Sequence, residues 1–215
     1  MNNIRIEGLT KKIKGNVILD NINIELYGGK IYGLVGKNGS GKTMLIRSIA
    51  GLMKPTDGRI LYNDKELYKD IDLIPKLGLV IENIGLYPEF TGFKNLKMLA
   101  DIRKIIDDKQ IKETMKAVYL DPDDKRKVRK YSLGMRQKLV LAQAFMENPD
   151  VILLDEPTNA LDENTVKSVY DLCRKAVQRN AIIVIASHSK EDISRLCNQK
   201  FTITDGCCHI EEELS

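Results

Sequence analysis

The sequence contains no long apolar run. No stretch approaches the ~18 consecutive apolar residues that a membrane-spanning helix requires. The N-terminal residues alternate between apolar and polar side chains, so they resemble a strand and lack the apolar segment of a secretion signal. These absences predict a cytoplasmic protein that reaches a membrane only through a partner.

Cysteine and net charge are also scarce. The four cysteines include no C-x-x-C pair, and Cys207 and Cys208 are adjacent. This spacing suits neither a zinc site nor an easy disulfide, so we expect reduced thiols. A formal net charge of +4 spread over 215 residues gives no argument for nucleic-acid binding. The chain is long enough for one well-buried core.

What the chain does contain is an alternation of strand and helix patterns. Short apolar runs typical of buried strands recur at 31–35, 77–81, 151–154, 182–186 and 201–204. Helical periodicity separates some of these runs, at 43–50 and 164–178. Strands that alternate with helices favour an α/β fold with a mostly parallel sheet covered on both faces.

One block in the middle of the chain interrupts this alternation. Apolar residues follow a helical period from 95 to about 120 and again from 134 to about 147. The apolar positions of the first stretch are Leu96, Leu99, Ile102, Ile105 and Ile106. A charged hinge at 121–127 separates the two stretches, and we expect the whole block to be an inserted helical subdomain.

Residues 36–43 match the pattern G-x-x-x-x-G-K-[ST] at every fixed position. Glycines let backbone N–H groups point inward at phosphate oxygens, and the helix beginning near Lys42 adds its positive dipole end. Lys42 places a charge between the outer phosphates, and the Thr43 hydroxyl can ligate Mg²⁺. The predicted strand before the loop and helix after it argue against a chance match. The expected ATP and Mg²⁺ contacts are Gly36, Lys37, Asn38, Gly39, Ser40, Gly41, Lys42 and Thr43.

The apolar run 151–154 ends in two carboxylates, Asp155 and Glu156. Alternation along a strand sends these side chains to different sides. Asp155 can therefore hold Mg²⁺ while Glu156 faces the attacking water. A strand ending in a solvated acidic turn is common for either residue alone, but the phosphate loop favours the catalytic interpretation.

Taken in order, these motifs resemble those of ABC transporter ATPase subunits over nearly the whole chain. Residues 159–162 resemble the D-loop of that family, which ends here in Asp162, and Ser187-His188 resembles its switch histidine. The segment 131–138 resembles the LSGGQ signature. It keeps the serine and the second glycine, as Ser132 and Gly134, and departs at three of the five positions.

The resemblance assigns roles to these residues. Catalysis would depend on Glu156, His188 and Lys42. Ser132, Gly134 and Asp162 would contact nucleotide, and the signature serine and glycine would face the ATP of a partner subunit. ATP and Mg²⁺ are the implied cofactors.

Two positions depart from the family pattern. Glu82 replaces the usual glutamine after the strand at 77–81, and a carboxylate still offers Mg²⁺ a hard oxygen ligand. With the altered signature, Glu82 makes the chain resemble subunits that export bacitracin or lantibiotic peptides.

Ile13 stands where an aromatic ring would stack on adenine. Stacking contributes about 1–3 kcal/mol per base, so we expect weaker discrimination between ATP and GTP unless Tyr27 or Tyr32 replaces the ring.

The resemblance implies a P-loop NTPase of the ABC ATPase type, with a mostly parallel core sheet, an N-terminal antiparallel β part and an inserted helical subdomain. The core lobe would comprise 1–83 and 146–215, and the subdomain 84–145.

Two copies, or one copy and a homologous ATPase subunit, would close on ATP. A polytopic membrane permease would dock at 85–90, where Tyr87 and Phe90 are either anchors or ordinary core residues. The protein would lie on the inner face of the cell membrane, without a nucleic-acid partner.

Two other functions are compatible with the phosphate loop. An ABC-type ATPase acting on ribosomes or DNA usually carries two cassettes or a long coiled coil, and this chain has one cassette and no sustained heptads. A nucleotide-binding module without turnover would have no need of Lys42, Asp155, Glu156 and His188 together. The basic run at 125–130 is either a lipid contact or a solvated surface.

Overall fold

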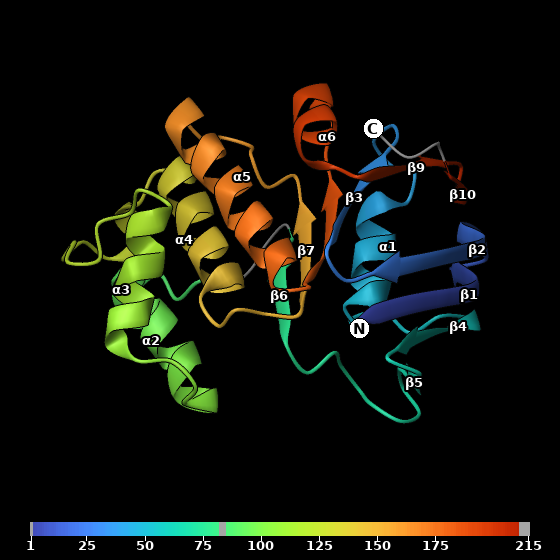
Figure 1. The fold of residues 1–215 in the computed structure, drawn as a ribbon, viewed down its shortest axis with the longest axis horizontal. Coiled ribbons are helices and arrows are strands. Elements are labelled where there is room, and N and C mark those ends of the chain that lie inside the picture. Colours follow the sequence, from blue (N-terminus) through green and yellow to red (C-terminus); the bar gives the residue numbers. More distant parts are fainter. Residues whose placement is uncertain (1, 82–84, 211–215) are drawn as a thin grey trace.

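The computed structural model of the chain describes residues 2–81 and 85–210. Two β-sheets lie beside each other in one part of the molecule, and the helices between 92 and 145 gather toward the other end (Figure 1). Among the described helices, none combines the length and the apolar character that crossing a membrane requires.

The larger sheet has six strands in the order β10-β9-β3-β8-β7-β6. Their bounds are β3 Lys30–Val35, β6 Leu77–Val80, β7 Val151–Asp155, β8 Ile182–Ala186, β9 Gln199–Thr204 and β10 Cys207–Ile210. All neighbours pair in parallel except the hairpin of β9 and β10. Every residue of β7 and β8 is buried, which is why their sequences are continuous apolar runs. The five strands expected from apolar runs are confirmed.

The parallel arrangement brings three loops to one edge of this sheet. Leu34 of β3 lies opposite Ala186 of β8, which in turn lies opposite Asp155 of β7. The carboxyl ends of these strands therefore meet, and ligands of open α/β sheets bind at such an edge. The segments that follow the three strands begin at Gly36, Glu156 and Ser187.

The smaller sheet is antiparallel and confirms the N-terminal β part. Its order is β2-β1-β4-β5, with bounds β1 Asn3–Ile13, β2 Asn16–Tyr27, β4 Asp57–Tyr62 and β5 Lys65–Glu66. Lys14 and Gly15 join β1 to β2, both with positive φ (49° and 85°), as in a tight hairpin turn. The buried face includes Ile4 and Ile6 and belongs to the same core cluster as Tyr32 of β3.

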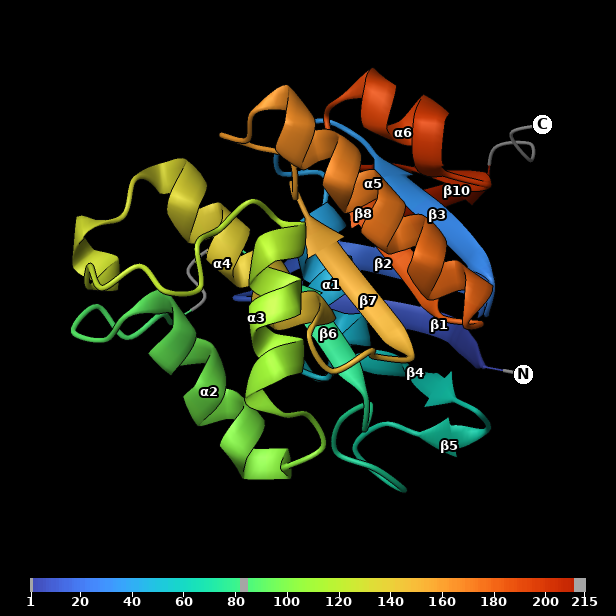
Figure 2. The ribbon, with the colours of Figure 1, turned by 60° about the vertical axis from the view of Figure 1, so that its left-hand side comes forward.

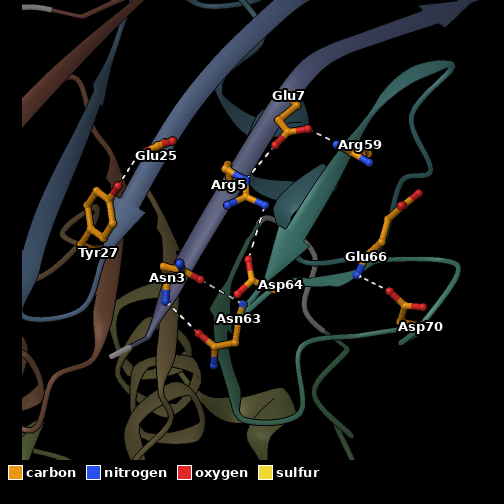
Figure 3. A network of polar contacts seen from close by, with 10 residues as sticks. All are labelled: Asn3, Arg5, Glu7, Glu25, Tyr27, Arg59, Asn63, Asp64, Glu66 and Asp70. Atoms are coloured by element: carbon orange, nitrogen blue, oxygen red, sulfur yellow. Dashed lines mark hydrogen bonds and ion pairs between the residues drawn. The ribbon is translucent and has the colours of Figure 1, made fainter.

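The other face of the smaller sheet carries a network of ion pairs (Figure 3). Glu7 of β1 accepts hydrogen bonds from Arg59 of β4 at 2.6 Å and from Arg5 at 2.7 Å. The hydrogen bond from Arg59 is the largest cause that lowers the pKa of Glu7. Arg5 also reaches Asp64 at 3.4 Å. Because these side chains are partly exposed, water screens the pairs, and their contribution to stability is small.

Helices cover both faces of the six-stranded sheet (Figure 2). The helices are α1 Lys42–Ile49, α2 Gly92–Arg103, α3 Asp108–Ala117, α4 Leu133–Phe145, α5 Glu163–Gln178 and α6 Lys190–Leu196, with a short 3₁₀ turn, η1, at Val128–Lys130. α1 lies between the two sheets and packs against β7 and β8, whereas α5 packs against β3 and β8 from the other side. The core is therefore split into two layers by the larger sheet.

The helical block differs from the expected pattern in one respect. The helical pattern predicted from 95 to about 120 is divided between two helices, because α2 ends at Arg103, its C-cap Lys104 has a left-handed conformation (φ 55°), and α3 begins separately. Asp107 starts α3 with a capping box that it shares with Gln110. Two of the apolar positions expected in the helical pattern are not buried: Ile102 in α2 and Ile105 between the two helices are 75% and 50% exposed. The division of the chain into lobes at 84 and 146 stays a prediction.

Candidate functional site

The loop between β3 and α1 can be built only with glycine at its ends. A Cβ at Gly36 would lie 2.3 Å from the carbonyl oxygen of Ile203 and 2.6 Å from Ser40 Oγ. Gly41 precedes α1 with φ 113° and supplies no side-chain cap. The first N–H groups of α1 therefore have no side-chain acceptor from the helix cap, which suits the start of α1 to binding an anion.

Lys42 is buried at the centre of this loop. Its ammonium group donates hydrogen bonds to the carbonyl oxygens of Gly36 at 2.7 Å and Lys37 at 3.0 Å. Burial lowers the pKa of Lys42, while the negative charges of Glu156 and Asp155 oppose that shift. The loop thus folds around a single ammonium group, with two carboxylates close enough to influence its charge.

Thr43 and Asp155 form a pair of oxygen ligands. The Thr43 hydroxyl donates to Asp155 Oδ2 at 2.6 Å, and Asp155 is buried at the end of β7. Hydroxyl and carboxylate oxygens are what Mg²⁺ prefers. In the described ranges no three His, Cys, Asp or Glu side chains gather into a metal site. Phosphate and water oxygens would have to complete the coordination, as is usual for Mg²⁺ bound with a nucleotide.

Glu156 and His188 face each other across the ends of β7 and β8. His188 Nε2 lies 3.2 Å from Glu156 Oε1, and the His188 backbone N–H donates to Oε2 at 3.4 Å. Glu156 has φ 48°, uncommon for a residue other than glycine, and its own N–H donates to Ala186 O at 2.8 Å. Burial raises the pKa of Glu156, so its carboxylate is a stronger proton acceptor than an exposed one.

These side chains line one cavity of about 360 Å³, which we call the phosphate cavity. Its lining residues are Ile18, Asn38, Gly39, Gly41, Lys42, Thr43, Met44, Asp155, Glu156 and His188. The structure thus brings the predicted phosphate loop, acidic strand and switch histidine together. Sequence reasoning missed Ile18 and Met44. Met44 directly follows the motif, whereas nothing in the sequence of β2 distinguishes Ile18, whose carbonyl oxygen would lie 3.1 Å from a Cβ at Gly41.

Ser132, Gly134 and Asp162 are not among the residues that line this cavity. Ser132 is the N-cap of α4, and its side chain accepts a hydrogen bond from Met135 N at 3.2 Å. A Cβ at Gly134 would lie 2.7 Å from the carbonyl oxygen of Ala160. The start of α4 therefore packs tightly against the loop that follows Glu156 in the same chain.

The carboxylate of Asp162 is fully engaged within its own chain. It accepts a hydrogen bond from Lys138 of α4 at 2.8 Å and caps α5 through the Thr165 N–H at 2.9 Å. The hydrogen bond from Lys138 is the largest cause that lowers the pKa of Asp162. Glu82, the remaining predicted ligand, lies outside the described residues.

Neither Tyr27 nor Tyr32 replaces the missing aromatic ring. Tyr32 is buried, stacks on Phe201 with ring centroids 5.8 Å apart, and its hydroxyl accepts from the Tyr27 N–H at 2.7 Å. Both tyrosines line a different groove, beside β9 and β10. Tyr32 does not reach the phosphate loop because strand alternation points its side chain from β3 into the core shared with the smaller sheet. Ile13, at the end of β1, is absent from the lining of the described cavity.

A second, larger cavity of about 930 Å³ also has Asp155 and Glu156 in its lining. Its lining residues are Val80, Ile81, Gly85, Leu86, Pro88, Val128, Arg129, Leu133, Arg136, Gln137, Val140, Asp155, Glu156 and Asn159. Tyr87 and Phe90 beside it are 52% and 39% exposed, so the interpretation of these two as core residues is wrong. Two carboxylates thus belong to both cavities.

The segment at 85–90 is held in place by its neighbours. The backbone of Tyr87 exchanges two hydrogen bonds with the buried side chain of Asn95, at 2.7 and 3.1 Å. Glu89 forms ion pairs with Lys127 at 3.0 Å and Arg129 at 3.4 Å. The segment is thereby joined to the basic run, which leads directly to α4.

Comparison with known proteins identifies the family. The family model described as ABC transporter matches residues 19–159. The uncharacterized ABC transporter ATP-binding protein YybJ of Bacillus subtilis is 46% identical over 211 residues, which cover 98% of this chain and 97% of that protein. The bacitracin transport ATP-binding protein BcrA of Bacillus licheniformis is 36% identical over 205 residues, which cover 94% and 67%.

The solved structures agree with the sequence relatives. A dimeric ATP-binding cassette in a post-hydrolysis state, bound to ADP and Pi, superposes with a TM-score of 0.89 at 25% identity and covers 99% of each chain. The expected fold class is confirmed, and the relatives support a transport ATPase over an ATPase that acts on ribosomes or DNA. The chain belongs to the ABC transporter family, as an ATP-binding subunit that hydrolyses ATP.

Proposed function

We propose that this chain binds ATP with Mg²⁺ in the loop at 36–43 and couples its hydrolysis to export of a bacitracin-like peptide through a separate membrane permease. The observation that carries the proposal is the shared cavity of Lys42, Thr43, Asp155, Glu156 and His188. The name and 36% identity of the bacitracin transport subunit support the class of cargo.

Phosphate binding follows from the geometry of the loop. The N–H groups of residues 36–43 and the start of α1 donate to phosphate oxygens, and the Lys42 ammonium group turns from the loop carbonyls to the outer phosphates. Thr43 and Asp155 would hold Mg²⁺, and Glu82 is the additional ligand proposed from sequence. A bound Mg²⁺ ion would supply neutralisation of the charge that develops on the phosphates during hydrolysis.

Hydrolysis requires one proton acceptor and one group that steadies the γ-phosphate. A water molecule attacks the γ-phosphorus and gives a proton to Glu156, while the bond from that phosphorus to the bridging oxygen breaks, which releases ADP and phosphate. His188 Nε2 lies 3.2 Å from Glu156 Oε1, and His188 is the group proposed to steady the γ-phosphate beside that carboxylate. Replacing Glu156 should therefore lower turnover while ATP binding is retained.

The signature residues act on the ATP of a second subunit. Ser132 and Gly134 are absent from the lining of their own chain's phosphate cavity, and Leu133 between them is 71% exposed. Two copies, or one copy and a homologous ATPase subunit, therefore close head to tail with Asp162 near the shared surface. The dimeric cassette among the solved structures supports this arrangement.

Replacing Ser132 by alanine is expected to lower turnover at least tenfold and to leave ATP affinity of the single chain within about twofold. The lost hydroxyl is one donor to the partner's γ-phosphate, worth a few kcal/mol in a closed site. Phosphate release and equilibrium binding of ATP measure the two effects. Asp107→Ala, which removes a comparable N-cap from α3, is the matched control and should keep parental turnover.

A mixture of chains tests whether Ser132 acts across the dimer. Ser132→Ala and Lys42→Ala chains are each defective alone. A mixed head-to-tail dimer contains one site built from an intact loop and an intact signature, so mixing should restore part of the activity. Turnover of the mixture equal to the sum of the two variants would contradict action across the dimer.

The permease is proposed to dock at the larger cavity, beside Tyr87 and Phe90. An amphipathic helix that fills an apolar groove uses such exposed aromatic anchors. This contact would hold the chain on the cytoplasmic face of the cell membrane.

Tyr87→Ala and Phe90→Ala are each expected to weaken co-purification with the permease by ~10- to 30-fold, the size of a hot-spot loss. Quantitative mass spectrometry of the polytopic protein recovered from membranes measures this. Tyr119→Ala, which removes a tyrosine that is likewise exposed but lies beyond the end of α3, is the control. Equal recovery with all three variants would place the permease elsewhere.

A further inference from the structure

Asp192, on the short helix α6, has a buried carboxylate without a role in the proposed hydrolysis step. Its side chain is 3% exposed. The carboxylate accepts hydrogen bonds from three hydroxyl groups, those of Thr158 at 2.7 Å, Ser187 at 2.9 Å and Tyr170 at 2.5 Å. These three donors come from separate parts of the chain, so Asp192 is a junction between them.

Two of the three donors adjoin the catalytic pair. Thr158 lies two residues after Glu156, and Ser187 immediately precedes His188. Both hydroxyls donate to the same oxygen, Oδ2 of Asp192. One atom therefore ties the loop that carries Glu156 to the loop that carries His188.

The junction is anchored from the opposite side. Tyr170 donates to Oδ1 from α5, the helix that packs against the six-stranded sheet. The backbone N–H of Asp192 donates to Ser189 Oγ, the N-cap of α6, at 3.1 Å. Hydrogen bonds to a buried charged acceptor are stronger than those between neutral groups, and losing the acceptor leaves buried donors unsatisfied. The carboxylate is therefore held by the scaffold while it holds the two loops.

We propose that Asp192 is a positioning residue for ATP hydrolysis, which fixes the loops after β7 and β8 so that His188 and Glu156 stay paired. The proposal rests on the roles assigned to Glu156 and His188 under the proposed function. Asp192 itself has no contact with the phosphate cavity and acts through Thr158 and Ser187.

Two variants weaken the junction with little change of shape. Thr158→Val removes one donor, and Asp192→Asn replaces a carboxylate by an amide that cannot accept all three hydroxyls. With the full chain, each is expected to lower kcat about tenfold, as for a lost hydrogen bond to a charged group, and to change the Kd for ATP by less than about twofold. Glu191→Gln, on the adjacent exposed carboxylate of α6, should keep the parental kcat. Melting temperatures establish that each variant is folded.

A double-mutant cycle with His188→Ala distinguishes positioning from general destabilisation. If Asp192 acts through His188, Asp192→Asn lowers kcat about tenfold in the parent and by less than about twofold in the His188→Ala chain. The same tenfold loss in both backgrounds, or no loss in the parent, overturns this inference and leaves the proposed function intact. A parental kcat for His188→Ala alone would instead overturn the role of His188 and with it this inference.

Discussion

Replacing Lys42 by alanine is expected to weaken ATP binding by about 100-fold and to reduce turnover to background. The ammonium group sits inside the loop, within hydrogen-bond distance of the Gly36 and Lys37 carbonyl oxygens, where the outer phosphates of ATP would be held. Its loss removes two or more charge-assisted hydrogen bonds, roughly 3 kcal/mol together, which corresponds to about two orders of magnitude in Kd. Equilibrium binding of a fluorescent ATP analogue measures the effect.

Lys37→Ala is the matched control for this experiment. The Lys37 side chain is exposed, and the contact of this residue with Lys42 is made by its backbone carbonyl. Removing the side chain takes away one positive charge near the loop but keeps the backbone N–H groups that would bind phosphate. We therefore expect ATP affinity within about threefold of the parent. An equal loss for both variants would mean that net positive charge, and not the position of Lys42, holds the nucleotide.

Replacing Glu156 by glutamine is expected to lower turnover by about 100- to 1,000-fold while ATP binding is retained. An amide has nearly the shape of the carboxylate but cannot accept the proton of the attacking water, and general-base catalysis typically contributes 10²–10⁴-fold. Burial raises the pKa of Glu156, which suits the parental side chain for this role. Phosphate release under saturating ATP measures the loss.

Retention of ATP by the Glu156→Gln chain should also change its oligomeric state. In the proposed cycle two subunits close on bound ATP and open on hydrolysis, so this variant should accumulate as an ATP-dependent dimer in light scattering. Glu163→Gln, at the exposed start of α5, is the control and should hydrolyse ATP like the parent. Parental turnover by Glu156→Gln would show that another group accepts the proton.

The strands and the phosphate loop were predictable because they depend on short-range patterns. The runs at 151–154 and 182–186 are buried on both faces and therefore continuously apolar. Parallel pairing then brings their ends, and the side chains of Asp155 and His188, to one edge of the sheet. The break between α2 and α3 was missed because it depends on the backbone conformation of Lys104 and the cap at Asp107.

Residues that act through long-range contacts could not be predicted in this way. Asp192 carries no motif, and its three donors lie between 5 and 34 positions away in the sequence. The sequence allows Tyr32 to replace the ring missing at Ile13, but only the structure shows the face of β3 from which Tyr32 projects. Ile18 likewise reaches the phosphate cavity only because β2 passes beside Gly41.

The most direct test of the assignment of ATPase activity to the phosphate cavity is phosphate release. It is measured on the purified full chain with ATP and Mg²⁺ at saturation. We expect release that saturates with ATP, at a rate on the order of 1 s⁻¹ or above, and that disappears when Mg²⁺ is chelated. A parental rate no greater than that of the Glu156→Gln chain, measured side by side, would contradict the assignment.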